Sequence, residues 1–297
     1  MCAAAVDKIC VIGVGLIGGS FARALKRGAL CGHIVGCGRS EQSLRRALEL
    51  GVIDSYSTRP AEAVAGAGLV MVATPLGAMR EVFSAICPAL DAGAVVTDAG
   101  SAKAAVIEAV VQACGRLPAN FVPGHPIAGT ENSGVEASFA ELFDRHRVIL
   151  TPLPQTSPDA LALVRGLWQQ IGAEVTTMDV DEHDQVLAAT SHLPHVLAFA
   201  LVASLAHRSE RQKIFDYAAG GFRDFTRIAS SDPRMWRDIC VDNSRALLDA
   251  LREFRADLDQ LAAAIEARDG DRIIEVFSAA KQARDQFVAD KRKRPGS

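Results

Sequence analysis

Residues 8–20 read Lys-Ile-Cys-Val-Ile-Gly-Val-Gly-Leu-Ile-Gly-Gly-Ser, and this stretch decides the fold of the chain. Its first part, 9–12, is a short apolar run of the kind that forms a buried strand. Three glycines follow with G-x-G-x-x-G spacing, and a helix-compatible stretch begins at Phe21. A strand, a glycine turn and a helix start together form a binding motif for the pyrophosphate of a dinucleotide.

Each glycine of the motif has its own role. Gly13 permits the tight turn, Gly15 lets the backbone approach the phosphates, and Gly18 lets helix and strand pack closely. The free N–H groups and the positive dipole end of the helix then face the anion. Because glycines also occur in ordinary turns, the flanking strand and helix carry this prediction. The cofactor contacts expected from this segment are Gly13, Gly15, Leu16, Ile17 and Gly18.

The length and composition predict a globular protein of two domains. The chain has 297 residues, of which 49% are hydrophobic and 23% charged, so it can bury a sizeable core. A formal net charge of −3 gives no general attraction to nucleic acid or to an anionic membrane. No uninterrupted apolar run reaches the roughly 18 residues of a transmembrane helix. Asp7 and Lys8 interrupt any signal peptide, so we expect a cytoplasmic protein without nucleic-acid or membrane partners.

Seven cysteines are scattered along the chain, at positions 2, 10, 31, 37, 87, 114 and 240, and none shows C-x-x-C spacing. An odd number of cysteines in apolar contexts suits a reducing compartment, where free cysteine behaves as a small core residue. This pattern favours free thiols and agrees with a cytoplasmic location.

The end of the second expected strand, 33–37, bears on the choice of cofactor. An NAD-preferring enzyme usually has an acidic residue here, which binds the ribose 2′-hydroxyl. This chain has Gly38, Arg39 and Ser40 instead. Nothing repels a 2′-phosphate, and Arg39 with Ser40 offers it charge-assisted hydrogen bonds, so the sequence favours NADP over NAD. The alternative is that Arg39 is a solvated loop residue near the adenine.

Strands and helical stretches alternate as far as residue 178. We expect strands at 69–73, 94–97, 147–151 and 174–178, and helices at 77–90 and 158–171. This alternation predicts the α/β class, with an N-terminal Rossmann-type, doubly wound, mostly parallel sheet. Ligands bind at the carboxyl ends of the strands of such a sheet. Thr74, Pro75, Ser101 and His125 follow expected strands, so we expect one common site, the first three residues beside the cofactor.

The rest of the chain is expected to be helical. Apolar residues recur at helical spacing through 184–207 and 235–265, and a last helix covers 272–288. An apolar stripe on a long helix needs a partner, and a second copy of the chain often provides it. We therefore expect a dinucleotide-binding domain (1–179), an all-helical substrate and dimerisation domain (180–290) and a basic tail (291–297). The tail is read as a solvated end or the stub of a linker.

Three further segments contain residues suited to chemistry. In Gly-His-Pro-Ile-Ala-Gly-Thr-Glu (124–131), His125 is a candidate general base because histidine titrates near neutral pH, although a lone histidine is often structural. Ser-His-Leu-Pro-His (191–195) places His192 and His195 on one helix face, near a helix start at Pro194. No third ligand accompanies them at metal spacing, so helix capping or pocket lining is favoured over zinc, and no metal is expected.

The third segment is Gly-Gly-Phe-Arg-Asp-Phe-Thr-Arg-Ile (220–228). Asp224 lies three residues before Arg227, a spacing that orders a guanidinium, and arginine is the usual clamp for a carboxylate. The alternative is a solvated, ion-paired helix face. Downstream, Asp-Pro at 232–233 indicates a helix start, and Trp236 is expected to anchor packing.

Taken together, six motifs resemble those of the prephenate/arogenate (cyclohexadienyl) dehydrogenases of tyrosine biosynthesis. They are, in order, Gly-Val-Gly-Leu-Ile-Gly-Gly-Ser (13–20), Asp-Ala-Gly-Ser-Ala-Lys (98–103), Gly-His-Pro-Ile-Ala-Gly-Thr-Glu (124–131), Ser-His-Leu-Pro-His (191–195), Gly-Gly-Phe-Arg-Asp-Phe-Thr-Arg-Ile-Ala (220–229) and Asp-Pro-Arg-Met-Trp-Arg-Asp-Ile (232–239). The resemblance covers about 8–285. It implies an oxidative decarboxylation: hydride passes from C4 of the ring to the nicotinamide, and the ring carboxylate departs as CO2.

The resemblance also implies a role for each matching residue. His125 accepts the proton of the C4 hydroxyl, and Ser101 hydrogen-bonds that hydroxyl or His125 and the nicotinamide. Arg227 holds the ring carboxylate of the dicarboxylate substrate, and His195 lines the site of its side chain. The helical domain is the homodimer interface. The remaining substrate-site residues implied are Glu131 and Asp224, in a charge network with Arg227, together with Gly220, Trp236, Thr130 and His192.

The chain departs from the family pattern at Gly38, where many relatives have an aspartate and use NAD. It also lacks an N-terminal chorismate mutase bundle and a long regulatory segment. Two other functions remain open from the sequence: a dehydrogenase of similar architecture acting on β-hydroxyacids, or a non-catalytic dinucleotide-sensing module. No residue decides between prephenate and arogenate.

Overall fold

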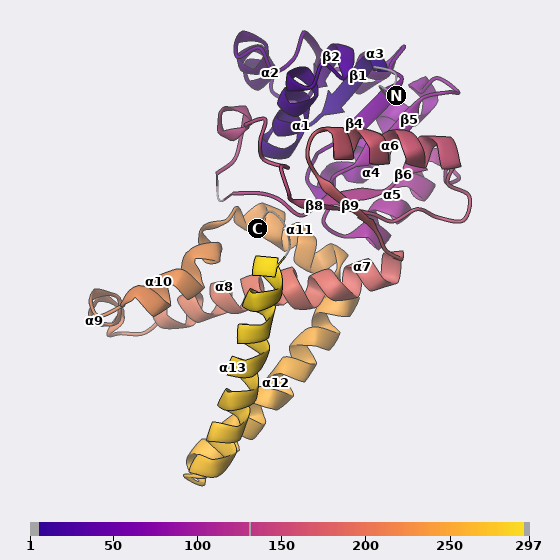
Figure 1. Ribbon diagram of the computed structural model, residues 1–297. Helices are drawn as coiled ribbons and strands as arrows, with labels where there is room; N and C mark the ends of the chain where they lie inside the picture. Colours follow the sequence, from indigo (N-terminus) through magenta and orange to yellow (C-terminus); the bar gives the residue numbers. More distant parts are fainter. Residues whose placement is uncertain (1–5, 131, 294–297) are drawn as a thin grey trace. The chain divides into compact units, whose positions relative to one another are not determined.

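The computed structural model describes residues 6–130 and 132–293, and it begins with the expected Rossmann-type sheet (Figure 1). Six parallel strands lie in the order β3-β2-β1-β4-β5-β6. They are β1 (Val6–Ile12), β2 (Cys31–Cys37), β3 (Ser55–Ser57), β4 (Leu69–Val72), β5 (Val95–Asp98) and β6 (Phe121–Val122). Five helices connect them: α1 (Leu16–Arg27), α2 (Glu41–Glu49), α3 (Pro60–Val64), α4 (Met79–Ile86) and α5 (Lys103–Cys114).

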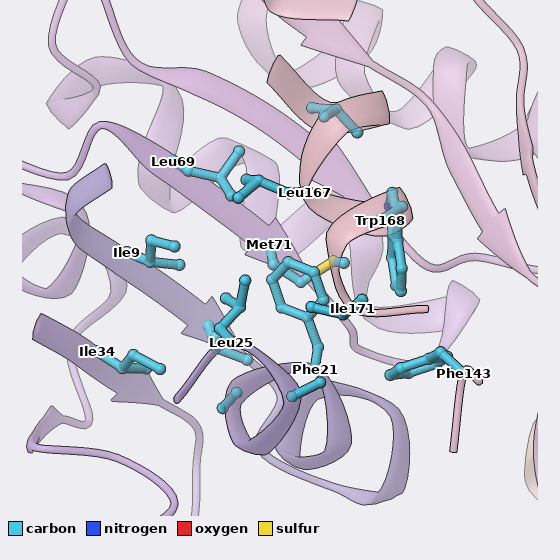
Figure 2. Close-up of a cluster of buried hydrophobic side chains, with 14 of the residues drawn as sticks. Ile9, Phe21, Leu25, Ile34, Leu69, Met71, Phe143, Leu167, Trp168 and Ile171 are labelled. Carbon is cyan, nitrogen blue, oxygen red and sulfur yellow. The ribbon is translucent and has the colours of Figure 1, made fainter. Parts of the chain in front are cut away.

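Alternate residues of the strands supply two apolar cores, one on each face of the sheet. In β1, Ile9 belongs to the first core and Cys10 to the second. Helices α1, α2 and α6 (Pro158–Gln170) cover the first face, where Phe21 packs against Trp168 with ring centroids 4.9 Å apart (Figure 2). Helices α3, α4 and α5 cover the second face. Because helices cover both faces, the sheet is doubly wound, as the sequence predicted.

A second, three-stranded sheet follows the first and contains His125. Its strands are β7 (Gly124–Pro126), β8 (Arg147–Leu150) and β9 (Glu174–Thr177), in that order. β7 runs antiparallel to β8, and β8 runs parallel to β9. His125 therefore lies within a strand, where its backbone pairs with Ile149, and not in the loop after a strand as expected.

The helical part of the chain begins with α7 (Val180–Leu187) and α8 (Leu193–Ala206), which a π-helical turn at 188–192 joins. Shorter helices follow: α9 (Arg211–Asp216), α10 (Gly220–Thr226) and α11 (Pro233–Asp242). The periodic stretch 235–265, expected to be continuous, is divided at Asn243. The side chain of Asn243 donates to the Asp184 carbonyl at 2.8 Å, so a tertiary hydrogen bond holds the break.

The chain forms two compact units, 1–244 and 245–297. The second unit consists of α12 (Ser244–Glu266) and α13 (Gly270–Lys293), apart from the first residue of α12. The expected domain boundary at 179/180 lies inside the first unit and is not tested by this division. Helix α13 continues to Lys293, so 291–293 are helical and not a separate tail, while 294–297 lie outside the described residues.

One helical stretch, Val180–Ala206, is long and apolar enough to cross a membrane by length and composition alone. Its apolar residues are not an uninterrupted run, because charged residues and histidines occur among them. The fourteen-residue α8 at its end has only Ala198 buried in this single chain. This helix therefore presents an apolar surface that the single chain covers only in part.

The prediction of free thiols was wrong for two of the seven cysteines. Cys87 and Cys114 form a disulfide, with Cα atoms 5.6 Å apart. They lie at the carboxyl ends of α4 and α5, which pack together in the second core, and their separation of 27 residues hid this proximity. Cys10, Cys31, Cys37 and Cys240 are free.

Candidate functional site

The glycine turn after β1 has the geometry that a pyrophosphate requires. A side chain at Gly13, where φ is +92°, would lie 2.5 Å from the Ala73 carbonyl oxygen, and one at Gly18 would overlap the Gly13 carbonyl oxygen. Glycine is therefore required at both positions. A side chain added at Gly15, in contrast, would have no other atom within 4 Å of its Cβ. No side chain caps the first turn of α1 beyond it, so its N–H groups at Leu16 and Ile17 remain available to an anion.

The end of β2 has room for either cofactor. Gly38 is half-buried, and a Cβ there would meet only Leu44, at 3.7 Å. Arg39 is exposed beside it. Ser40 has a structural role not foreseen from the sequence, since its Oγ caps α2 by accepting from the Ser43 N–H at 3.2 Å. Of the two residues proposed for a 2′-phosphate, Arg39 is the one not used in capping.

The loop between β5 and α5 is pinned by a buried ion pair. The Lys103 ammonium donates to Asp98 Oδ2 and to the Gly124 carbonyl oxygen, each at 2.5 Å. Asp98 Oδ1 accepts from the Gly124 N–H at 3.1 Å. Burial lowers the pKa of Lys103, and the adjacent Asp98 opposes this. The pair holds the loop that carries Ser101 against the residue that precedes His125.

His125 lies at the centre of a buried polar cluster. It is 8% exposed, and its Nδ1 is 2.9 Å from Nε2 of His183 in α7. Nδ1 of His183 is in turn 2.7 Å from Asp184 Oδ1. Burial lowers the pKa of His125 well below its usual value, and His183, Lys103 and His192 lower it further. The imidazole is therefore neutral near pH 7, as a proton acceptor must be.

Asp184 joins this cluster to the start of α5. Its carboxylate accepts from the backbone N–H of Lys103 at 2.8 Å and of Ala104 at 3.0 Å. A carboxylate from α7 thus caps α5, which has no side-chain cap of its own. Burial acts to raise the pKa of Asp184, but the hydrogen bonds from His183 and from these two amides outweigh burial and lower it.

The polar cluster extends to the histidines of 191–195. Nδ2 of Asn243 lies 3.0 Å from Nδ1 of the buried His192. Trp236, a buried packing anchor as expected, contacts His192 edge-on and stacks on His195 at a centroid distance of 3.6 Å. His195 Nδ1 donates to the Ser191 carbonyl at 2.8 Å, which leaves its Nε2 as an acceptor. No group of side chains in 6–130 and 132–293 is arranged to hold a metal ion.

The burial of His192 predicts a loss of stability in mild acid. Burial lowers its pKa from 6.5 to about 4. Between these pH values, His192 is therefore protonated in the unfolded chain and neutral in the folded chain. Stability from this group is complete above pH 6.5 and falls by about 3 kcal/mol as the pH drops through the window to pH 4. Urea unfolding between pH 7.5 and 4.5 measures the slope.

His192→Asn keeps an acceptor for Asn243 and removes the titration, so its stability should change less with pH than that of the wild type. His207→Asn, at an exposed histidine, provides the matched control. Equal slopes for all three proteins would contradict the assignment to His192.

Burial lowers the pKa of His195, and the guanidinium of Arg227 lies close enough to lower it further. Arg227 begins the turn Arg227–Ser230 after α10, and it is exposed. Asp224 is 4.0 Å from Arg223, and both side chains are exposed. Gly220 begins α10. Thr130 is exposed, with its Oγ1 accepting from the Asn132 N–H, whereas Glu131 lies outside the described residues.

The remaining cofactor-site residues lie in loops at the carboxyl ends of the strands. Thr74 and Pro75 follow β4, and Ser101 follows β5. Thr74 Oγ1 contacts the Met79 sulfur at 3.7 Å. Ser101 is half-buried, and in the described part of the chain its hydroxyl has no hydrogen-bond partner. That hydroxyl is thus available to a ligand.

The sequence did not reveal part of this cluster: Lys103, His183, Asp184 and Asn243. Lys103 stands in a quoted motif, but nothing there indicated that its side chain is buried. His183 and Asp184 belong to an ordinary polar helix start, and Asn243 lies within an apolar periodicity. Only tertiary contacts distinguish these residues from surface residues.

Comparisons with known proteins agree with this fold. The family models of the prephenate dehydrogenase nucleotide-binding domain and dimerization domain match residues 21–177 and 179–279. A cyclohexadienyl dehydrogenase from Zymomonas mobilis is 42% identical over 97% of this chain and 98% of its own length.

Two solved structures show the same architecture. The first is prephenate dehydrogenase from Aquifex aeolicus in complex with hydroxyphenyl propionate and NAD+, with a TM-score of 0.89, 37% identity, and coverage of 96% of this chain and 99% of that one. The second is arogenate dehydrogenase from Synechocystis, with a TM-score of 0.79, 29% identity, and coverage of 94% and 99%. The fold, the site and these matches along nearly the whole chain lead to one conclusion: the chain belongs to the prephenate dehydrogenase family.

Proposed function

We propose that His125 is the general base and Arg227 the carboxylate clamp of this enzyme, with NADP as the preferred cofactor. The chain is an NAD(P)-dependent oxidoreductase, and its reaction is the oxidative decarboxylation of prephenate or arogenate. The observation that supports the base most is the burial of a neutral His125 in a hydrogen-bonded cluster at the ligand edge of the fold.

In this proposal the bound nicotinamide accepts hydride from the ring carbon that carries the hydroxyl. The task of His125 is to accept the hydroxyl proton as hydride leaves, which makes that carbon a better hydride donor. Ser101, with its available hydroxyl, orients the substrate hydroxyl or the imidazole. The proton returns to the ring oxygen after CO2 has left, because the product is a phenol.

The other substrate contacts are assigned mainly to charges and aromatic groups of the helical part, together with Thr130 and Glu131 of the N-terminal part. Arg227 binds the ring carboxylate through paired N–H donors. His195, stacked on Trp236, faces the side chain of the substrate, with Gly220 and Thr130 in the pocket wall. Asp224 and Glu131 complete the charge network around Arg227. Because His192 is buried, we assign it a supporting role in the wall of the pocket.

Steady-state assays with prephenate and arogenate, each with NAD and NADP, test the substrate and cofactor assignments together. Turnover of either cyclohexadienol supports the site, and the ratio of kcat/KM values gives the preference. β-Hydroxyacids provide the control for the alternative dehydrogenase class. Turnover of β-hydroxyacids alone would contradict the proposal, and cofactor binding without any turnover would point to a sensing module.

The preference for NADP is tested at the end of β2. Arg39→Ala is expected to raise the KM for NADP by about 10–100-fold and to change that for NAD little, because a charge-assisted contact is lost. Gly38→Asp should reverse the preference, since its Cβ fits at 3.7 Å from Leu44. Arg45→Ala, in α2 where Arg45 pairs with Glu41, is the matched control. Equal losses for both cofactors would contradict a 2′-phosphate contact.

We assign dimer formation to the helical part, in agreement with the dimerization-domain match. Large apolar side chains of α12 and α13 are exposed in the single chain: Leu258 by 48%, Ile265 by 57%, Ile274 by 64% and Phe277 by 56%. Exposed apolar area of this kind is typical of obligate dimers. Ile274→Lys is expected to shift the mass in light scattering from dimer to monomer, whereas Leu48→Lys in α2 should not. A monomeric wild type at micromolar concentration would contradict this assignment.

We keep the functional division made from the sequence, with 1–179 binding the cofactor and 180–290 binding substrate and the second subunit. The two family models meet between 177 and 179, which supports this boundary. We also propose a cytoplasmic location, in keeping with relatives named as cyclohexadienyl and prephenate dehydrogenases.

A further inference from the structure

We infer that His183 and Asp184 set the tautomer of His125, so that its Nε2 carries the lone pair that accepts the substrate proton. The inference rests on the proposed function of His125 as base. It makes His183 and Asp184 positioning residues, because neither is required to touch the substrate. The argument follows the hydrogen bonds from Asp184 towards His125.

The first step is that Asp184 is an ionised acceptor. Its carboxylate receives the N–H groups of Lys103 and Ala104 at 2.8 and 3.0 Å, and Nδ1 of His183 lies 2.7 Å from Oδ1. Three donors around one carboxylate favour its charged form. An ionised carboxylate can only accept, so the proton in the bond to His183 resides on Nδ1 of His183.

The second step concerns His183, which has no exposed surface. Burial lowers its pKa, which the hydrogen bond to Asp184 opposes without reversing the shift, so the ring is neutral near pH 7. A neutral imidazole carries one N–H, and His183 has placed it towards Asp184. Its Nε2 is therefore an acceptor.

The third step concerns the hydrogen bond between His183 and His125. Its Nδ1 is 2.9 Å from the accepting Nε2 of His183, so Nδ1 of His125 must be the donor. His125 is also neutral, which leaves the lone pair on its Nε2. In the opposite tautomer, the lone pairs of His125 Nδ1 and His183 Nε2 would face each other in a buried site with no proton between them. The chain Asp184–His183–His125 thus holds the base in the form that can take a proton.

The same chain stabilises His125 after it has accepted the proton. The imidazolium still donates through Nδ1 to His183, and the charge of Asp184 lies one ring further away. No second proton transfer is required. The other titratable groups around His125 are Lys103, whose charge is compensated by Asp98, and the imidazole of His192, which is neutral near pH 7. The compensating charge for the imidazolium therefore comes from Asp184.

The tautomers can be measured directly on the unmodified apo protein. Selective 15N labelling of histidine, with His125→Asn and His183→Gln used for assignment, is expected to show a protonated Nδ1 and an unprotonated Nε2 on both rings at pH 7. This reading depends on neither cofactor nor turnover, because the tautomers are read from the wild-type protein and the two variants serve only to assign its resonances. A protonated Nε2 on His125 would overturn the inference.

Two variants of His183 test its consequence for catalysis. His183→Leu removes the acceptor, whereas His183→Gln places an amide oxygen near the former Nε2. The Leu variant is expected to lower kcat by about 10–100-fold with little change in KM, since the imidazolium loses its partner. The acid limb of its kcat/KM profile should move to lower pH for the same reason. The Gln variant should recover most of the wild-type kcat and bring the acid limb close to its wild-type pH. A loss of packing at position 183 would not explain such a recovery.

The outcomes separate this inference from the proposed function. If His125→Asn keeps wild-type turnover, the proposed base is wrong, whatever the tautomer. If His125→Asn is inactive while His183→Leu retains wild-type kcat and an unmoved acid limb, only the role of His183 and Asp184 is overturned. Melting temperature and cofactor binding by fluorescence verify that each variant is folded.

Discussion

Replacing His125 with asparagine is expected to lower kcat by about 10²–10⁴-fold while prephenate and cofactor still bind. Asparagine places an amide nitrogen close to the former Nδ1, so it can keep the bond to His183 that holds this side chain. The asparagine has no basic lone pair at the position of the His125 Nε2. The loss therefore falls on proton acceptance and not on folding or binding, and it appears in kcat more than in KM.

Steady-state kinetics and cofactor titration by fluorescence measure the two parts of this prediction. His146→Asn is the matched control, because His146 is exposed in the loop before β8. In the wild type the acid limb of kcat/KM should lie below pH 6.5, since burial lowers the pKa of His125. An unchanged kcat in His125→Asn would remove this residue as the base.

Replacing Arg227 with alanine is expected to raise the KM for prephenate by about 30–100-fold and to change kcat much less. A guanidinium that binds a carboxylate through two N–H groups contributes about 2–3 kcal/mol, and this contact exists before and during hydride transfer. Its loss therefore weakens binding uniformly and raises KM. His195 would also lose the nearby positive charge that lowers its pKa.

Arg223→Ala is the matched control for Arg227, since it lies one helical turn earlier and its side chain is exposed next to Asp224. It should leave the KM for prephenate within about twofold. An analogue of the substrate without the ring carboxylate should bind the wild type and Arg227→Ala equally. A larger effect from Arg223 than from Arg227 would place the carboxylate elsewhere.

Local sequence signals were sufficient for the main features of the fold. The apolar run at 9–12 and the glycines after it predicted β1, the tight turn and α1, because steric demands at Gly13 and Gly18 are local. The alternation of strands and helical stretches predicted the parallel sheet, and the Asp-Pro pair at 232–233 predicted the start of α11. The short helices α2, α3 and α9 were missed, since their few turns depend on packing more than on pattern.

What the sequence by itself determined was the order of strands and helices and the loops that follow the strands, because periodicity and turn chemistry act over a few residues. Only the tertiary structure decided that His183, Asp184 and Asn243 meet His125 and His192, and that Cys87 meets Cys114. These groups are brought together by packing between elements far apart in sequence. A buried polar group is recognisable by its partners, and its partners exist only once the chain has folded.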